Sequence, residues 1–392
     1  MERDKRGFNT RVVQSGELKD PRFGNVTTPI FENSTFESPN VNRDAYIDDT
    51  TGKPFLYTRW GNPTIQALEE KYSSAEGSER GLAFSSGMGA INAAVLSFAK
   101  KGDRILSLNE LYGQTFSLFA HTFPEFGIGV DFLHLNEMNG GEYSLSGYKM
   151  LYTESVVNPT MGVSDLEEIG KKCAEEGVPL LVDATFATPY NQRPLEMGAS
   201  VVVHSASKYI SGHTDVIMGM VGCMKDNYGA ISTMRKTLGS NADPLQAFLA
   251  MRGLKTLGLR MEKHNSNGMK ISRFLEQHEK VRKVMYPGLE SFPYYEIAKR
   301  NLSGFGGMVA FEVKGGLEDA REVMRNLKLI SPAPSLGGVE SLMTLPVDTS
   351  HVSLTPEERA DAGIADGLIR LSLGIEDPED IIEDLDRAMN AI

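Results

Sequence analysis

Short apolar runs alternate with helical patterns between residues 81 and 205. Six of these runs are too short for helices and predict strands. Most are continuously apolar rather than alternating in polarity, which is typical of parallel strands covered on both faces by the helices between them. The six predicted strands span residues 81–85, 104–109, 130–135, 150–155, 179–184 and 200–205.

Capping and turn residues predict where several helices begin and end. One helix is expected to begin in a capping box at Ser164 and to end at Gly177. A further helix is expected to start at Asn62-Pro63, because Pro63 suits a first helical position. Two more starts are expected at Thr355 and Asp377, where a cap, a proline and an acid follow one another in the order that a helix start favours.

The two ends of the chain differ from this middle part. Residues 1–60 are rich in Asn, Thr, Pro and Gly and have no sustained periodicity, which is typical of an extended arm. From Leu254 to Leu275, apolar residues recur at spacings of three and four, which predicts one long amphipathic helix as a hinge. We therefore expect an N-terminal arm, a large domain and a smaller C-terminal α/β domain, spanning residues 1–60, 61–256 and 257–392.

Composition and charge exclude several classes of protein. Hydrophobic residues make up 41% and charged residues 23% of the 392 residues, so a disordered chain, a collagen and a coiled-coil rod are excluded. The formal charge of −12 argues against a nucleic-acid partner. Cys173 and Cys223 form no zinc pattern or disulfide framework and are expected to be buried thiols in a reducing compartment. Without a signal peptide or a long apolar span, we expect a cytoplasmic protein that does not enter a membrane.

Two polar residues follow predicted strands, at the sheet edge where parallel sheets bind ligands. Asp183 ends an apolar strand and either caps the next turn or faces a ligand cation. Lys208 follows the next strand after a turn of small residues. It is either a solvated side chain or, if desolvated, a nucleophilic amine suited to bond formation with a carbonyl group.

Two further positions suit anions. The turn over residues 85–89 joins a strand to a helix, so that free N–H groups at the helix start could bind one phosphate. Close packing of its small residues is the alternative reading. Arg370 lies within the strand pattern LIRLSLG and either faces solvent or, if the strand is buried, binds a carboxylate with two hydrogen bonds.

A metal site is not expected. His204, His213 and Asp215 are residue types that bind metals. Their H-x8-H-x-D spacing matches no common zinc site, so satisfied polar side chains are the preferred interpretation.

Several long motifs occur in a characteristic order: YTRWGNPT (57–64), SSGMGAI (85–91), YGQTF (112–116), VNPT (157–160), VDATFATPY (182–190), VVVHSASKYISGHTDVIMG (201–219), SLGGVESL (335–342) and IRLSLGIEDPEDI (369–381). With these motifs nearly the whole chain resembles the pyridoxal 5′-phosphate enzymes of Cys/Met metabolism. That group includes cystathionine γ-synthases, cystathionine γ-lyases, methionine γ-lyases and O-acetylhomoserine sulfhydrylases. The resemblance implies the aspartate-aminotransferase-like fold, which is fold type I, with a large, mostly parallel seven-stranded sheet domain and a smaller C-terminal α/β domain.

The resemblance also implies roles toward the cofactor. Lys208 would bind it covalently and then move protons between substrate carbons. Asp183 would pair with the protonated pyridine nitrogen, which keeps the ring an electron sink. Tyr112 would stack on the ring and assist proton transfer with the leaving group. The residues that would surround the phosphate within the same chain are Ser86, Gly87, Met88, Ser205 and Ser207.

Further roles concern the substrate and a second subunit. The resemblance implies that Arg370 binds the substrate α-carboxylate, and that Asn158, Ser335 and Glu340 also contact the substrate. Two residues that follow the arm, Tyr57 and Arg59, would reach the phosphate of a neighbouring subunit. The implied assembly is a homotetramer, built as a dimer of dimers with shared sites, that acts on small amino acids.

The sequence departs from the family pattern at a few positions. Ala184 and Ser207 replace the commoner Asn and Thr, and neither change touches an essential role. Gln114 stands where methionine γ-lyases usually have Cys and cystathionine enzymes usually have Gly. Glu340 resembles the cystathionine enzymes. We therefore expect a cystathionine γ-lyase or γ-synthase, with methionine γ-lyase or O-acetylhomoserine sulfhydrylase as the alternative.

Two alternatives come from other classes of protein. A nicotinamide-dependent dehydrogenase would also be an acidic α/β protein, but it needs a GxGxxG turn that SSGMGA does not supply. A non-catalytic scaffold of the same fold would be expected to lose Lys208 or Asp183, and both residues are present.

Overall fold

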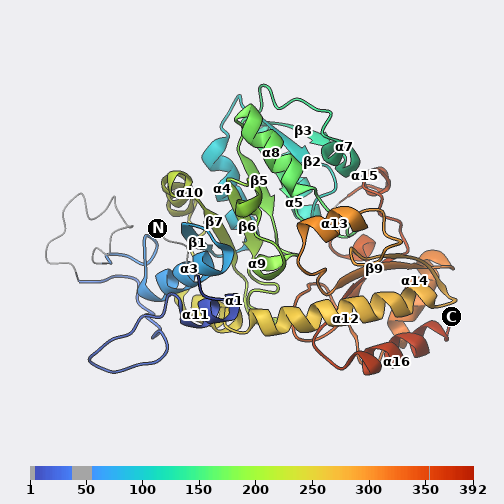
Figure 1. Cartoon of the computed structure of the whole chain (residues 1–392). Coiled ribbons are helices and arrows are strands. Elements are labelled where there is room, and N and C mark those ends of the chain that lie inside the picture. Colours follow the sequence, from blue (N-terminus) through green and yellow to red (C-terminus); the bar gives the residue numbers. More distant parts are fainter. Residues whose placement is uncertain (1–4, 38–54, 353) are drawn as a thin grey trace.

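The computed structural model describes residues 5–37, 55–352 and 354–392 (Figure 1). A seven-stranded sheet forms its larger part, and β7 runs antiparallel to both neighbours while the other paired strands are parallel. The expected mostly parallel seven-stranded sheet is therefore confirmed. In spatial order its strands are β1 (Arg80–Phe84), β7 (Gly219–Cys223), β6 (Val201–Ser205), β5 (Leu180–Asp183), β4 (Leu151–Glu154), β2 (Arg104–Leu108) and β3 (Gly129–Leu133).

Strand β7 is the one of these seven that the apolar pattern did not predict. Its sequence GMVGC contains two glycines, which disfavour strands. Both are required by close packing: a Cβ on Gly219 would lie 2.2 Å from the backbone oxygen of Ser86, and one on Gly222 would lie 3.1 Å from Cγ of Glu76. Positions 219 and 222 point to opposite faces of a strand, so helices cover the sheet on both faces, as expected.

The helices around this sheet are mostly short. They are α1 (Phe8–Gln14), α3 (Pro63–Glu76), α4 (Gly87–Phe98), α5 (Gly113–Ser117), α6 (Phe123–Glu125), α7 (Leu135–Gly140), α8 (Leu166–Glu176), α9 (Thr188–Asn191), α10 (Lys225–Leu238) and α11 (Pro244–Leu254), with the single turns η1 (Leu118–Thr122) and η2 (Pro194–Met197). No helix in the described ranges is long and apolar enough to cross a membrane.

The capping predictions have mixed outcomes. Thr355 caps its helix with a side-chain hydrogen bond, as predicted, and the helix expected at Pro63 begins there, with Asn62 as its cap. The helix predicted after Ser164 does end at Gly177, but the capping box at its start is wrong. The Ser164 hydroxyl instead donates to the backbone oxygen of Glu154 at 2.7 Å, because the adjacent strand end lies within its reach.

The arm is more ordered than its composition predicted. Residues 8–14 form helix α1, in which Val12 is fully buried. Lys71 of α3 is buried beneath this segment and donates to the backbone oxygens of Val13 (3.1 Å) and Ser15 (2.6 Å). Tertiary hydrogen bonds therefore order a segment without periodicity. The rest of the predicted arm includes residues 38–54, which lie outside the described residues.

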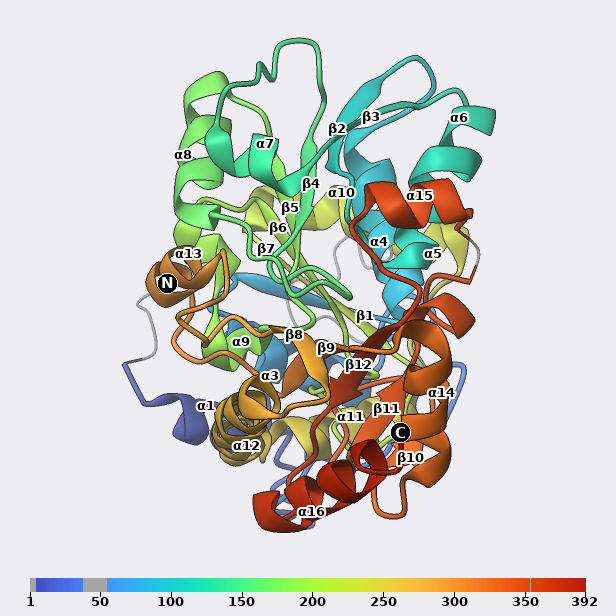
Figure 2. The same ribbon diagram turned by 90° about the vertical axis from the view of Figure 1, so that its right-hand side faces the viewer.

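A second, five-stranded sheet forms the smaller part of the protein (Figure 2). One of its strands, β12, corresponds to the strand pattern LIRLSLG of the sequence, and β10 and β11 are very short. In spatial order the strands are β10 (Ser331–Pro332), β11 (Leu342–Thr344), β12 (Leu368–Ser372), β9 (Met308–Val313) and β8 (Val281–Met285). The helices here are α13 (Tyr295–Asn301), α14 (Gly316–Asn326), α15 (Pro356–Asp361) and α16 (Pro378–Met389), with the turn η3 (Pro346–Asp348).

Helix α12 (Leu257–Gln277) extends below both sheets in Figure 1 and packs against α9 on one side and β8 on the other. The predicted single helix from Leu254 is wrong at its start, because α11 ends there and two residues separate it from α12. Gly253 lies against Ser211, whose backbone oxygen would be 2.0 Å from an added Cβ. This close approach requires a glycine at position 253.

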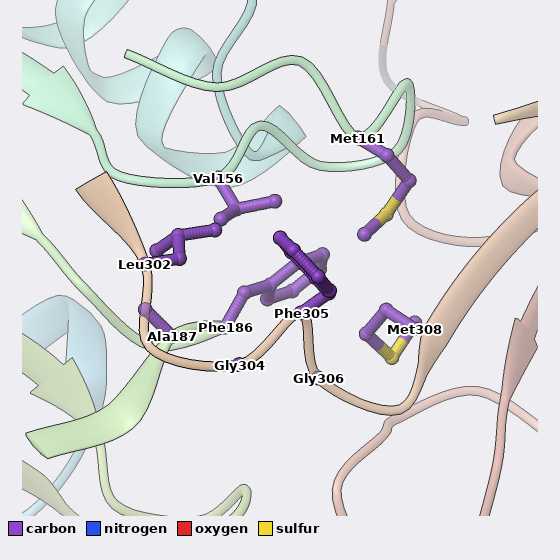
Figure 3. A pocket seen from close by; sticks show the side chains of 9 residues that line it. All are labelled: Val156, Met161, Phe186, Ala187, Leu302, Gly304, Phe305, Gly306 and Met308. Carbon is purple, nitrogen blue, oxygen red and sulfur yellow. The ribbon is translucent and has the colours of Figure 1, made fainter. Parts of the chain in front are cut away.

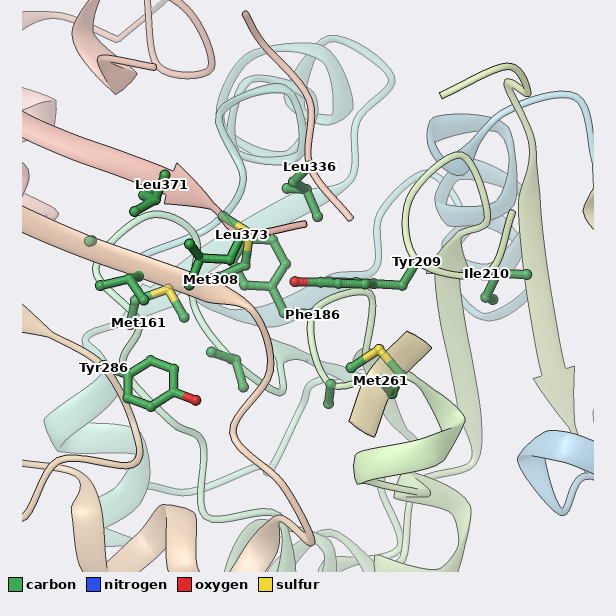
Figure 4. Packing of buried hydrophobic residues seen from close by; sticks show 14 of the residues in the cluster. Met161, Phe186, Tyr209, Ile210, Met261, Tyr286, Met308, Leu336, Leu371 and Leu373 are labelled. Atoms are coloured by element: carbon green, nitrogen blue, oxygen red, sulfur yellow. The ribbon is translucent and has the colours of Figure 1, made fainter. Parts of the chain in front are cut away.

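One hydrophobic cluster joins the two parts of the protein. Phe186 and Tyr209 follow strands of the large sheet, and Met308 and Leu371 belong to the small one (Figure 4). Beside it lies a small apolar pocket in which Phe305 stands between Val156 and Met308 (Figure 3). None of the predicted site residues lines this pocket, so it is separate from the candidate site.

Candidate active site

The carboxyl ends of five parallel strands bring the predicted site residues to one edge of the large sheet. This is the edge at which open parallel sheets bind ligands. The residues at this edge are Ser86, Gly87 and Met88 after β1, Tyr112 after β2, Asn158 after β4, Asp183 on β5, Ser205 on β6, and Ser207 and Lys208 in the turn after β6. The small sheet supplies Arg370 on β12 and the loop that contains Ser335.

Lys208 contacts the small part of the protein through its amine. Its Nζ donates a hydrogen bond to Oγ of Ser335 at 2.7 Å. Burial and the nearby positive charge of Arg370 lower the pKa of Lys208 to about 8. The backbone of Ser335 has φ +88°, a strained conformation for a residue other than glycine, which is common at functional sites. A substantial fraction of this amine is therefore neutral and nucleophilic near neutral pH.

Asp183 is held by the turn that follows its strand. The backbone N–H of Thr185 donates to Oδ1 of Asp183 at 2.9 Å, and the Thr185 hydroxyl accepts the N–H of Ser205 at 2.8 Å. Burial raises the pKa of Asp183 above its usual value, and the hydrogen bonds from Thr185 and the charge of His204 offset this only in part. Its side chain is thus fixed at the strand end, as a carboxylate that faces a cation would need to be.

The start of helix α4 and the end of β6 form a small anion cradle. Ser86 caps α4, with its hydroxyl accepting the N–H of Gly89 at 3.0 Å. A Cβ on Gly87 would lie 3.0 Å from Cβ of Ser205, so only glycine allows the helix start to approach this serine so closely. The Ser207 hydroxyl is already bonded to the backbone of Met218. The helix N–H groups and Ser205 are therefore the better-placed donors for a phosphate.

Arg370 is buried, which excludes the outward-facing alternative. It is 3% exposed, and every residue of β12 is buried. Its Nη1 donates to Oδ1 of Asn158 (3.0 Å) and its Nη2 to the backbone oxygen of Ser335 (3.1 Å). Its Nε has no hydrogen-bond partner among the described residues. Burial lowers the pKa of Arg370 to about 10, which leaves it charged at neutral pH with an unused donor.

Tyr112 lies nearer to solvent than the buried Arg370. It precedes helix α5, and the residue is 36% exposed. Burial of the hydroxyl raises the pKa of Tyr112, the charge of Arg370 lowers it, and Glu154 raises it. The phenol is therefore protonated at neutral pH and can donate a proton. Gln114 is exposed on the same short helix.

Glu340 and Ser335 lie on the same loop, between β10 and β11, but make different contacts. Its Oε1 accepts a hydrogen bond from the hydroxyl of Thr214. Thr214 has φ +58°, the left-handed conformation that non-glycine residues rarely adopt. Within the described residues, no hydrogen bond connects Glu340 with Lys208 or Arg370.

Tyr57 and Arg59 are not brought to the site of their own chain. Nη1 of Arg59 donates to the backbone oxygen of Lys236 at 3.1 Å, at the end of α10. Its guanidinium lies 5.7 Å from the ring centre of Tyr57 and 5.4 Å from that of Trp60. The structure thus places these two side chains on a surface of the chain, at α10.

Two residues of the site were missed by the sequence analysis. Glu154 is the last but one residue of the predicted strand 150–155, as Asp183 is of the predicted strand 179–184, so the signal was available. His351 gave no such signal. It is fully buried, its Nε2 donates to the backbone oxygen of Leu111 at 3.3 Å, and burial lowers its pKa to about 4. It joins the small part of the protein to the segment before Tyr112.

The donor set fits an aromatic aldehyde with a phosphate group. An amine with a lowered pKa can bind the aldehyde, the α4 start can bind the phosphate, and a fixed carboxylate can pair with a ring nitrogen. Within the described ranges, no group of three or more His, Cys, Asp or Glu residues is placed to hold a metal ion.

Comparison with known proteins agrees with this arrangement. The family model of the Cys/Met metabolism PLP-dependent enzymes matches residues 9–390. The L-methionine γ-lyase of Fusobacterium nucleatum is 40% identical over 396 aligned positions, which cover all of both chains. The cystathionine γ-lyase of Dictyostelium discoideum is 39% identical and covers 98% of this chain and 97% of its own.

A solved structure gives the same result in three dimensions. The cystathionine γ-lyase of Lactobacillus plantarum, complexed with L-serine, superposes with a TM-score of 0.92 at 34% identity and covers 99% of this chain and 98% of its own. The fold is thus that of fold type I. From its sequence and fold together, the chain belongs to the Cys/Met metabolism PLP-dependent enzymes, and its cofactor is pyridoxal phosphate.

Proposed function

We propose that this enzyme breaks the Cγ–S bond of sulfur amino acids by γ-elimination, with cystathionine preferred to methionine. The observation that carries the proposal is the buried guanidinium of Arg370, which has an unused Nε donor and belongs to the same hydrogen-bonded group as the Lys208 amine. A substrate α-carboxylate satisfies that donor. The α-carbon then lies near an amine that can accept its proton.

The proposed reaction gives each site residue a defined role. When bound, the cofactor supplies an electron sink for negative charge at the substrate α-carbon. Asp183 pairs with the cofactor's ring nitrogen, and the α4 start with Ser205 binds its phosphate. Lys208 would hold the cofactor until the substrate amine takes its place, and the freed, neutral amine would then accept the α-proton and move protons between substrate carbons. Tyr112, protonated at neutral pH, donates a proton to the departing sulfur.

The overall reaction balances with water. The Cγ–S bond breaks and the sulfur leaves as a thiol, while the remaining carbon skeleton and amine are released as a 2-oxo acid and ammonia. If a thiol adds at Cγ before release, the same residues carry γ-replacement, the reaction of a γ-synthase. A yellow protein that releases ammonia from cystathionine would support elimination.

The choice of cystathionine depends on Glu340. The distal ammonium group of cystathionine can pair with this carboxylate, whereas the methyl group of methionine cannot. We expect kcat/KM for cystathionine to exceed that for methionine, and Glu340→Gln to reduce the ratio about 10-fold, the worth of one charge-assisted hydrogen bond. Ammonia release from cystathionine and from methionine measures this ratio. Formation of the thioether or thiol amino acid from the O-acetyl and O-succinyl esters of homoserine, with cysteine or sulfide, measures replacement.

A second candidate function is methionine γ-lyase. The 40% identity to the Fusobacterium enzyme favours it. A kcat/KM for methionine equal to or above that for cystathionine would reverse the ranking and establish this candidate. Replacement activity that exceeds elimination with a homoserine ester would instead indicate a γ-synthase or a sulfhydrylase.

We also propose that the active unit is a homotetramer, a dimer of dimers in which each site is shared between two chains. Support comes from Tyr57 and Arg59, which lie at α10 and have no hydrogen bond with the described site residues of their own chain. A stacked tyrosine and arginine at the surface can serve the phosphate of a second copy.

Complementation between two inactive variants tests the shared site. Arg59→Ala damages the partner's site, whereas Lys208→Ala destroys the chain's own site. After subunit exchange, each mixed dimer has one intact site, so a random mixture should recover about a quarter of wild-type activity. Absence of recovery despite verified exchange would mean that Arg59 serves its own chain.

We propose the division into residues 1–60, 61–256 and 257–392 as arm, large domain and small domain. The separate sheets and the start of α12 at Leu257 support it. The small domain still reaches across the boundary through α15. Asp361 at the end of this helix accepts a hydrogen bond from Asn109 at 2.9 Å, and α15 lies beside α5 in Figure 2.

We propose a cytoplasmic location. Cys173 and Cys223 are both free and buried. Burial raises the pKa of each thiol to about 12, so neither is reactive at neutral pH. Unpaired, inert cysteines suit a reducing compartment.

A further inference from the structure

Glu154 is a buried carboxylate to which the proposed reaction assigns no task. It is the last residue of β4, it is 4% exposed, and it lies opposite Asp183 in the register of β4 and β5. Burial and the charge of Asp183 raise its pKa well above the usual value. No lysine or arginine among the described residues forms an ion pair with it. A buried acid in this setting is costly, so its contacts require an explanation.

Both oxygens of Glu154 accept hydrogen bonds from backbone N–H groups. Oε1 accepts the N–H of Tyr112 at 2.6 Å, and Oε2 accepts the N–H of Asn158 at 3.2 Å. These two residues belong to different loops, one after β2 and the other after β4. One carboxylate therefore sets the position of both loops relative to each other.

Each of these loops carries a side chain of the proposed site. Asn158 accepts a hydrogen bond from Arg370, so its position limits where the guanidinium can point. Tyr112 carries the phenol proposed to protonate the departing sulfur. The two groups act at different points of the same substrate, the α-carboxylate and the sulfur. Their separation must match the substrate if both are to act at once.

We propose that Glu154 is a positioning residue that sets the distance between the carboxylate-binding Arg370 and the proton donor Tyr112. This inference rests on the proposed function and adds a residue to it. Glu154 acts through the backbone of Tyr112 and Asn158 and touches neither substrate nor cofactor. Its effect therefore differs from that of a residue that only stabilises the fold.

The test uses Glu154→Gln in the holoenzyme. A glutamine keeps the shape but presents an NH₂ group to one of the two N–H donors, so one loop loses its partner. We expect the Kd of 4-(methylthio)butanoate, a carboxylate that lacks the amine, to rise about 10-fold by calorimetry, the equivalent of one charge-assisted contact. We expect kcat for cystathionine to fall as well, while cofactor content stays at the wild-type level.

A matched control separates positioning from stability. Asp384 is also 4% exposed and accepts the backbone N–H groups of Lys328, Leu329 and Ile330 in the small domain, away from the site. Asp384→Asn should lower Tm but leave the Kd and kcat unchanged. Glu154→Asp, which keeps the carboxyl group on a shorter side chain, should give an intermediate Kd and provides a second folded variant.

A double-mutant cycle decides whether Glu154 acts through Asn158. In the cycle with Asn158→Ala, the double variant should bind 4-(methylthio)butanoate no more weakly than Asn158→Ala alone, because both changes disturb the same contact to Arg370. Additive losses, or a Glu154→Gln variant with lowered Tm but unchanged Kd and kcat, would overturn the inference. If the wild type binds the carboxylate but turns over no sulfur amino acid, the proposed function fails while the cycle still reports on Glu154.

Discussion

Lys208→Ala should yield a folded protein that no longer forms a covalent bond with its cofactor and loses about 10⁴-fold in kcat/KM, the upper range for removal of a catalytic acid–base group. The reason is that one amine is proposed both to hold the cofactor and to accept the substrate α-proton. The wild-type structure presents this amine next to Ser335, with a pKa lowered to about 8 by burial and by Arg370.

Borohydride reduction followed by peptide mapping provides the measurement. The label should lie on Lys208 in the wild type and should be lost in the variant. Lys225, an exposed lysine at the start of α10, serves as the control, because its replacement should change neither label nor rate. Because Lys208 must be neutral to react, cofactor uptake by the apoprotein should become faster as the pH rises through about 8. A label on any other lysine would refute the assignment.

Arg370→Leu should reduce kcat/KM for amino-acid substrates by about 30- to 1,000-fold, which corresponds to a loss of about 2–4 kcal/mol of charge-assisted hydrogen bonding. The guanidinium is buried and already bonded to Asn158 and Ser335, so solvent cannot replace its contact with a carboxylate. Cofactor affinity should change far less, because the phosphate cradle lies at the α4 start.

Steady-state kinetics and cofactor titration of the same preparation separate these two effects. Arg370→Lys keeps the charge but loses the planar pair of donors, so its kcat/KM should lie between those of the wild type and Arg370→Leu. A folded Arg370→Leu protein with unchanged kcat/KM would show that the substrate carboxylate binds elsewhere. Equal losses of cofactor and substrate affinity would indicate general damage to the site.

Local sequence patterns predicted most of the large sheet because each strand is a continuous apolar run between turn signals. They failed where tertiary packing imposed a residue against its propensity. The apolar pattern did not predict β7, because Gly219 and Gly222 interrupt it. Glycines stand there because packing on the two faces of the sheet leaves little room for side chains. Ser164 was predicted to cap a helix, but its hydroxyl bonds to the strand end instead. A capping pattern depends only on residues close together in the sequence. It therefore cannot show that a backbone oxygen elsewhere in the chain competes for the hydroxyl of the capping residue.

The sequence by itself determined the fold type, the cofactor and the residues at the strand ends. Long motifs and apolar periodicity are properties of neighbouring residues along the chain, so they can be recognised without a structure. Only the tertiary structure decided which of these residues meet. Lys208 reaches Ser335, and Arg370 reaches Asn158, because the small sheet packs against the carboxyl edge of the large one. Glu154 gained its significance in the same way. Its two N–H donors come from separate loops at the edge of the large sheet, and spacing along the chain does not show which loops lie side by side there.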